Sequence, residues 1–168
     1  MQKRILVVAI LILVAVGLYL RTHRRSGTAL QHSPAADFSL PQLNLQTLRL
    51  SDYRGKIVLL DFWATWCDPC REETPHLVEL QNKYRDQGLQ IIGVSMDDGP
   101  EPVREFYQQF HMNYPVVMGN AEVSERYGGV LGLPIAFVIG RDGRIYARHI
   151  GATEVSVLEQ EVKKLLSP

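Results

Sequence analysis

The chain has two cysteines, and they stand close together in the stretch FWATWCDPCREETP, residues 62–75. Such a pair can hold a metal, form a structural disulfide or carry redox chemistry. A structural zinc site needs four ligands, usually two such pairs, and the isolated His76 does not supply a second pair. A disulfide that closes so short a loop would constrain the unfolded chain very little. The spacing of Cys67 and Cys70 therefore favours a redox-active pair over a metal site or a structural disulfide.

The elements around the pair must place Cys67 where a strand ends and a helix begins. Residues 57–64 are apolar on both alternating faces, which is typical of a central strand covered on both sides. Residues 68–84 have apolar side chains at helical spacing, and Gly88 ends the pattern. The free N–H groups and the dipole at the start of this helix would favour the thiolate of Cys67.

Asp61 interrupts the apolar strand. A carboxylate is difficult to ionise in such surroundings, so we expect its pKa to be raised. A protonatable group beside the cysteines can exchange protons during the reaction, and Asp61 is the candidate acceptor for the proton of Cys70.

The remaining pattern predicts an α/β domain with a mixed sheet and helices on both faces. A short hairpin is expected in residues 38–50, a second buried strand in 89–95, and a helix that Pro102 starts in its first turn. Further elements are expected in the second half of the chain: a strand in 114–119, a short helix near 121–127, a hairpin of 133–139 and 144–150 around Asp142 and Gly143, and an amphipathic helix with Val155, Leu158, Val162, Leu165 and Leu166 on one face.

Composition fits one globular domain. Of the 168 residues, 46% are hydrophobic, and 18 basic side chains balance 18 acidic ones, so nothing favours binding to nucleic acid. The domain is expected over residues 37–168. Residues 1–4 are a short basic terminus, 5–20 an apolar run predicted to anchor the chain in a membrane, and 21–36 a flexible tether.

The membrane segment has one rival interpretation, a cleaved signal peptide whose small-residue site would be SPAA, residues 33–36. Basic residues lie on both sides of the apolar run, so the positive-inside rule does not choose an orientation.

The stretch LLDFWATWCDPCREETP resembles the active-site segment of the thioredoxin superfamily. The similarity lies in its Asp-Phe-Trp-Ala, its Trp-Cys-x-Pro-Cys and Pro75 five residues after the second cysteine. The expected hairpin, the anchor and the extra segment near residues 97–120 are similar to membrane-anchored thiol–disulfide oxidoreductases of the TlpA and ResA type. The resemblance covers about residue 37 to the C-terminus. It implies a thioredoxin fold with an N-terminal β-hairpin and a central αβ insertion, preceded by one transmembrane helix.

The resemblance also assigns roles to residues. Cys67 would be the exposed nucleophile, and Cys70 would resolve the mixed disulfide. Asp61 matches the buried aspartate that thioredoxins carry six residues before the first cysteine. Glu73 matches a glutamate near the active site of ResA-type proteins, where it would handle protons or recognise substrate; the alternative is a solvated glutamate like Glu72.

Three further residues are expected at the surface that meets a substrate. Pro134 fits the cis-proline that lies opposite the cysteines in this superfamily, and the backbone of Leu133 before it would pair with a substrate strand. Trp66 would form part of a flat apolar collar, whereas Trp63 is expected in the core. The sequence departs from the pattern of these families at two positions. Asp68 replaces the glycine of thioredoxin, and its negative charge favours a reducing over an oxidising cysteine pair. Ile135 stands where related cytochrome c maturation proteins often have an acidic residue.

The predicted function is thiol–disulfide exchange with no cofactor and no metal. The resemblance implies a single-pass protein of the inner or plasma membrane with its catalytic domain on the extracytoplasmic, periplasmic side. Its partners would be protein disulfides or dithiols and a membrane or periplasmic thiol that donates electrons, with cytochrome c maturation as one pathway. A peroxiredoxin-like peroxidase is the first alternative, although a Thr-x-x-Cys with its preceding proline is missing. A binding module or chaperone that works without its cysteines is the second.

Overall fold

The computed structural model describes residues 32–130 and 132–167 of the chain. The predicted membrane anchor, residues 5–20, lies outside them. Within the described residues, no helix combines the length and the apolar character that crossing a membrane requires.

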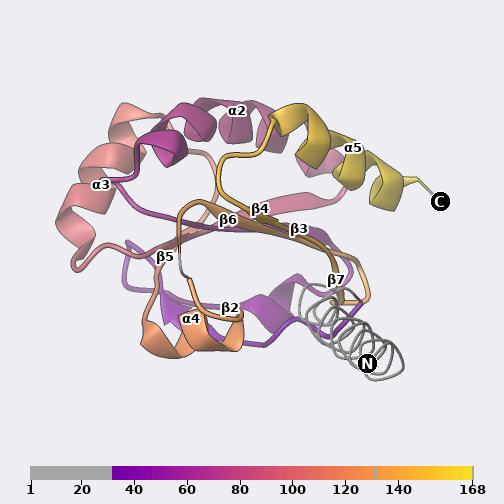
Figure 1. Ribbon diagram of the computed structural model, residues 1–168, viewed down its shortest axis with the longest axis horizontal. Helices are drawn as coiled ribbons and strands as arrows, with labels where there is room; N and C mark the ends of the chain where they lie inside the picture. The colour runs from indigo at the N-terminus through magenta and orange to yellow at the C-terminus, as the bar shows by residue number, and fades with distance from the viewer. Residues whose placement is uncertain (1–31, 131, 168) are drawn as a thin grey trace, which may run out of the picture. The chain divides into compact units, whose positions relative to one another are not determined.

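A five-stranded mixed sheet forms the centre of the domain (Figure 1). Its order is β5 (Val116–Met118), β4 (Leu89–Ser95), β3 (Ile57–Trp63), β6 (Ile135–Ile139) and β7 (Ile145–Ile150). The pairs β3–β4 and β4–β5 are parallel, whereas β3–β6 and β6–β7 are antiparallel. The mixed sheet predicted from the sequence is therefore confirmed, with β3 as its buried central strand.

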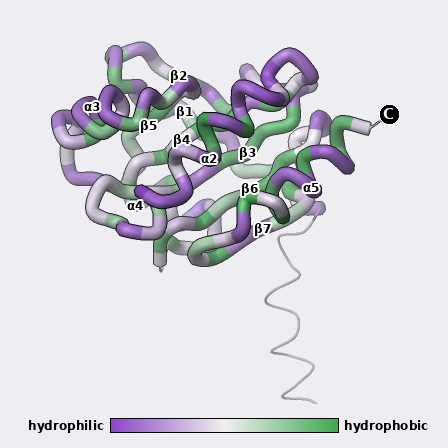
Figure 2. The backbone as a smooth tube through the Cα atoms, turned by 90° about the horizontal axis from the view of Figure 1, so that it is seen from above, coloured by the Kyte–Doolittle hydropathy of each residue, from purple (hydrophilic) through white to green (hydrophobic). Residues whose placement is uncertain are grey.

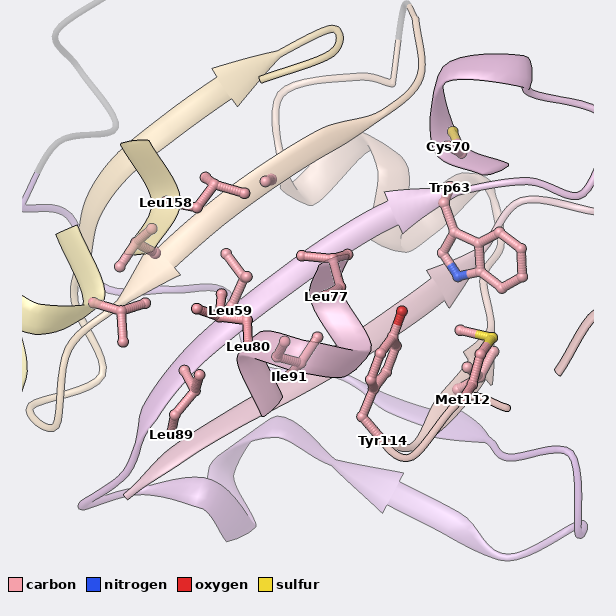
Figure 3. Packing of buried hydrophobic residues seen from close by; sticks show 14 of the residues in the cluster. Leu59, Trp63, Cys70, Leu77, Leu80, Leu89, Ile91, Met112, Tyr114 and Leu158 are labelled. Atoms are coloured by element: carbon pink, nitrogen blue, oxygen red, sulfur yellow. The ribbon is translucent and has the colours of Figure 1, made fainter. Parts of the chain in front are cut away.

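Helices α2 (Asp68–Tyr84), α3 (Pro100–Gln109) and α5 (Val155–Leu166) contribute to one apolar core with alternate residues of β3 and β4. Figure 3 shows this core, with side chains from α2, α5 and the two strands in contact range of one another. In Figure 2, β3 is mostly coloured as hydrophobic, whereas α2 and α5 alternate between hydrophobic and hydrophilic residues. That alternation is the amphipathic pattern expected of helices that cover a sheet.

The opposite face of the sheet is covered by α4 (Ala121–Arg126) and by a hairpin of β1 (Ser39–Pro41) and β2 (Thr47–Arg49) (Figure 1). Aromatic side chains fill the space beneath these elements. They are Phe38, Phe62, Tyr127 and Phe137, whose ring centroids lie 5.0 to 6.5 Å apart. The predicted hairpin and the helices on both faces are thus confirmed, and 3₁₀ turns at Leu50–Tyr53 and Arg85–Gln87 complete the connections.

Two boundaries differ from the sequence-based expectation. Helix α3 begins at Pro100 rather than at Pro102, with Gly99 as its N-cap. The first N–H groups of a helix have no partner within it, so both prolines fit in the first turn and the earlier one begins it. The folded unit also begins earlier than residue 37, at His32.

The residues that precede the predicted domain pair with residues 143–145, at the start of β7. The backbone N–H groups of His32 and Ala35 donate hydrogen bonds to the carbonyls of Ile145 and Gly143, over 2.5 and 2.9 Å. Pro34 forms an antiparallel bridge with Arg144. Residues 32–36, the last part of the predicted tether, are therefore a short edge of this domain.

Candidate active site

Cys67 and Cys70 form a disulfide at the start of α2, with an S–S distance of 2.09 Å. Cys67 is the N-cap of the helix, and its sulfur accepts a hydrogen bond of 3.3 Å from the backbone N–H of Cys70. Pro69 has no N–H, so this bond satisfies one of the few free donors of the first turn. The same donor would stabilise a thiolate on Cys67 after reduction.

The two cysteine residues differ slightly in exposure. In this disulfide form Cys67 is 6% exposed and Cys70 2% exposed. The expectation of an openly exposed Cys67 is therefore wrong for the oxidised protein, because the N-cap position turns its sulfur back over the first helical turn. Cys67 is still the more accessible of the two, as a nucleophile requires.

Asp61 lies in the middle of β3, between Gly93 of β4 and Ala136 of β6. Side chains alternate along a strand, so Asp61 shares the α2-facing side with Leu59 and Trp63. It is only 5% exposed, and one carboxyl oxygen, Oδ1, has no hydrogen-bond partner among the described residues. Burial raises the pKa of this carboxyl well above its ordinary value, and the charge of Glu73 raises it further. The burial and the raised pKa expected for Asp61 are both present.

Glu73 is the second buried carboxyl group, one helical turn beyond Cys70. It is 8% exposed, whereas its neighbour Glu72 faces solvent. Burial raises the pKa of Glu73 to about 7. Its Oε2 atom has no hydrogen-bond partner within the part of the chain that is described. A solvated glutamate, the alternative weighed for this position, does not fit these surroundings.

Two hydroxyl groups that the sequence did not suggest join these carboxyls. Thr74 donates a hydrogen bond of 2.8 Å to the carbonyl of Cys70, and the hydroxyl of Tyr114 is buried near it. Burial raises the pKa of Tyr114, and the charges of Asp61 and Glu73 raise it further. Figure 3 shows the Tyr114 ring directing its hydroxyl toward the part of the core that holds Leu77 and Trp63. The polar cluster behind the disulfide therefore consists of Asp61, Glu73, Thr74 and Tyr114.

The turn before β6 lies beside the cysteines. Phe62 at the end of β3 pairs with Ile135, which places the preceding Pro134 next to the strand end that leads to Cys67. The Leu133–Pro134 peptide bond is cis, as the resemblance implied. The carbonyl of Pro134 accepts a hydrogen bond from Gly151, whereas the backbone groups of Leu133 make none with the described residues.

The two tryptophans occupy contrasting positions. Trp66 is 68% exposed next to Cys67, in agreement with an apolar collar at the site. Trp63 is fully buried and packs against Phe106 with a centroid distance of 4.7 Å, so it belongs to the core as expected. The roles of all these residues in exchange stay predictions.

A disulfide-bonded Cys-x-x-Cys pair at the start of a helix, following a central strand, is the arrangement found in thioredoxin-type thiol–disulfide oxidoreductases. The AhpC/TSA family model matches residues 32–148. The chain belongs to this family, within the thioredoxin superfamily.

Curated relatives agree with the class. The chain is 35% identical over 132 residues to the thiol-disulfide oxidoreductase ResA of Bacillus thuringiensis subsp. konkukian (strain 97-27), covering 78% of this chain and 76% of the relative. It is 32% identical over 161 residues to ResA of Geobacillus thermodenitrificans (strain NG80-2), covering 95% of this chain and 92% of the relative.

Solved structures show the same fold. A crystal structure provisionally assigned as the thiol:disulfide interchange protein DsbE of Chlorobium tepidum has a TM-score of 0.77 at 33% identity, covering 82% of this chain and 98% of that one. The thioredoxin domain of a thiol-disulfide oxidoreductase from Bacteroides vulgatus has a TM-score of 0.74 at 28% identity, with the same coverage. The protein is thus a thiol–disulfide oxidoreductase with a thioredoxin-like fold.

Proposed function

We propose that this oxidoreductase reduces disulfides of other proteins through a mixed disulfide. The thiolate of Cys67 attacks a substrate disulfide and releases one substrate thiolate. Cys70 then attacks the Cys67 sulfur, which releases the second thiolate and leaves the Cys67–Cys70 disulfide. A membrane or periplasmic dithiol reduces that disulfide again, so each turnover moves two electrons from donor to substrate. The observation that carries the proposal is the Cys67 sulfur at the helix start beside the exposed Trp66.

The buried carboxyls fit the proton transfers of this reaction. Cys70 must lose a proton before it can attack, and it regains one when the disulfide is reduced. Asp61 and Glu73 lie on the inner side of the pair, and their raised pKa values suit groups that exchange protons near neutral pH. We assign Asp61 as the acceptor for Cys70 and Glu73 as a second group that handles protons.

The charge of Asp68 supports the reducing direction. Asp68 stands between the cysteines in the first turn of α2. Negative charge opposes a thiolate and therefore raises the free energy of the reduced form in which one is present. A couple whose reduced form is disfavoured gives up its electrons more readily.

Cytochrome c maturation is the narrower form of this proposal. The haem attachment sequence Cys-x-x-Cys-His can form a disulfide that must be reduced before haem is attached. Ile135 is a buried residue of β6 and provides no acidic group after Pro134. A preference for such a peptide would then have to come from Trp66, Leu133 and Glu73.

The proposed location is the extracytoplasmic side of the inner or plasma membrane, with residues 5–20 as an uncleaved single-pass anchor. The pairing of residues 32–35 with residues 143–145 supports this over cleavage at SPAA, because Ala35 is buried and cleavage there would separate bonded residues from the domain. A reporter fused after residue 168 should be active outside the cytoplasm and should stay with membranes after a carbonate wash. A reporter released into the soluble fraction would favour the cleaved form.

The reaction is tested with the full-length protein in mild detergent. It should reduce insulin with dithiothreitol as electron source, and Cys67→Ala should abolish this activity. In native membranes, Cys70→Ser should retain substrate proteins on Cys67 as mixed disulfides, whereas Cys67→Ser should retain none. Peroxide turnover at a comparable rate, or full activity without either cysteine, would refute the proposal. An oxidised Cys-x-x-Cys-His peptide that reacts no faster than insulin would refute its narrower form.

A further inference from the structure

Thr65 lies in the loop of residues 64–67 between β3 and α2, called here the Trp66 loop. The loop is a tight turn in which the N–H of Cys67 donates to the carbonyl of Ala64 over 3.2 Å. It carries the exposed Trp66 and ends at the nucleophile. The contacts that fix Thr65 therefore influence the direction in which the Trp66 ring projects from the domain surface.

Asp97 holds Thr65 from one side. Its Oδ2 atom accepts the backbone N–H of Thr65 over 3.0 Å, and its Oδ1 atom accepts the Thr65 hydroxyl over 2.5 Å. The carboxylate is fixed in turn by Ser95, whose hydroxyl donates to Oδ2 over 2.8 Å and accepts the N–H of Asp97 over 3.2 Å. Asp97 and Ser95 are both buried, and Ser95 pairs with Trp63 at the strand end that leads into the loop.

Arg71 holds Thr65 from the other side. Its guanidinium donates a hydrogen bond of 3.2 Å to the carbonyl of Thr65. The same group lies over the rings of Phe106 and Phe110, at 5.3 and 5.4 Å from their centroids, and these two rings stack on each other. A planar guanidinium that stacks on aromatic faces is more closely fixed than a lysine would be.

We propose that Asp97 and Arg71 are positioning residues that fix Thr65 through its N–H, hydroxyl and carbonyl groups and so orient Trp66 for contact with a protein partner. All three hydrogen-bonding groups of Thr65 are occupied by side chains from outside the loop. A ring that is already ordered loses less conformational freedom when a partner binds. The inference rests on the proposed reduction of protein disulfides, because only a protein partner would need this contact.

The test uses the full-length protein in detergent with Trp63→Phe as the parent, so that Trp66 is the remaining tryptophan of the two. Time-resolved fluorescence anisotropy reports the motion of the Trp66 ring. Steady-state kinetics with insulin and with a small aromatic disulfide separate partner contact from the chemistry of the cysteines. Thr65→Val removes the hydroxyl at nearly constant shape, Thr65→Ser retains it, and Thr47→Val, in the exposed hairpin strand β2, is the matched control.

Thr65→Val should enlarge the fast component of the Trp66 anisotropy decay and raise KM for insulin about tenfold, with a much smaller change for the small disulfide. Thr65→Ser should restore both values, and Thr47→Val should match the parent. If Thr65→Val does not fold, Arg71→Met, which removes the bond to the Thr65 carbonyl at a half-buried position, should give the same two effects. An unchanged anisotropy decay in the folded variants, or equal losses in Thr65→Ser and Thr65→Val, would overturn the inference. Failure of the parent to reduce insulin would instead reject the proposed function, and the anisotropy measurement would still decide the positioning role.

Discussion

Asp61, at the centre of β3, and Glu73, in the second turn of α2, are buried close enough for the charge of Glu73 to raise the pKa of Asp61. Each carboxyl has one oxygen without a hydrogen-bond partner among the described residues. Burial is the larger cause of the raised pKa of Asp61, and it also raises the pKa of Glu73 to about 7. Two carboxyl groups in such surroundings titrate as a pair, and we expect the pair to retain a proton near neutral pH.

Asp61→Asn should stabilise the oxidised domain near neutral pH. A carboxyl whose pKa is raised in the folded state is protonated there while the unfolded chain ionises, so stability falls as pH rises from the unfolded pKa toward the folded one. The loss is about 1.4 kcal/mol for each pH unit in that window, and an amide does not have it. Denaturant unfolding from pH 4 to pH 8 measures the difference, with Asp86→Asn, at an exposed position, as the control.

The same variant should slow resolution of the mixed disulfide, because Cys70 loses its proton acceptor. Decay of a mixed disulfide with a chromogenic thiol, followed in a stopped-flow instrument, should slow by roughly tenfold to a hundredfold. Decay at the wild-type rate, together with parallel stability curves for the variant and the wild type, would leave Asp61 with no role in the reaction.

Glu73→Gln should remove an inflection near pH 7 from the pH profile of disulfide exchange, because the pKa of Glu73 lies at about 7. The wild type should lose on the order of 3 kcal/mol of stability as pH rises from 4.5 to 7, in which range the unfolded chain ionises this group and the folded one does not. Glu72→Gln is the matched control, since Glu72 is exposed in the same turn. Identical profiles for the two variants would contradict the assignment of Glu73.

The sequence was sufficient for most of the fold. Residues 57–64 were predicted as a central strand from two-sided apolar character, and β3 is Ile57–Trp63. The helix predicted for 68–84 is α2 without change, because Pro69 suits its first turn and the 3₁₀ turn that continues it ends at Gly88, in the left-handed region. The start of α3 was misplaced because two prolines suit a first turn and the pattern does not choose between them.

Site residues could be predicted from the sequence where the local pattern of apolar residues indicated that they are buried. Asp61 stands in a strand that is buried on both faces, and Glu73 shares a helical face with Leu77 and Leu80, which Glu72 does not. The hydroxyl of Tyr114 gave no such signal. Tyr114 precedes β5 and reaches α2 only through tertiary packing, so neither its own neighbourhood nor the cysteine segment indicated the contact.

Tyr114→Phe should lower the free energy of unfolding by about 1 kcal/mol, because the polar interactions of a buried hydroxyl near Thr74 are lost while the ring still fills the core. Thr74 keeps its own bond to the carbonyl of Cys70, which limits the effect. Tyr107→Phe, at a half-buried position, should change stability by less than about 0.5 kcal/mol. Urea unfolding at pH 7 compares the two, and a larger loss for Tyr107→Phe would contradict the assignment of Tyr114.

Substitution of the two tryptophans should have different effects, one on the stability of the domain and the other on its contact with a protein partner. Trp63→Ala should destabilise the domain by about 3–5 kcal/mol, because it empties a fully buried site against Phe106. Trp66→Ala should change stability by no more than about 0.5 kcal/mol, since its ring is 68% exposed. It should nevertheless lower kcat/KM for insulin by about tenfold, as exposed aromatic side chains commonly provide much of the binding energy between proteins. Urea unfolding and insulin turnover on both variants measure these effects, with a small aromatic disulfide as the second substrate. If Trp66→Ala reduced insulin as fast as the wild type, or lost activity toward both substrates equally, the ring beside Cys67 would have no part in recognising proteins.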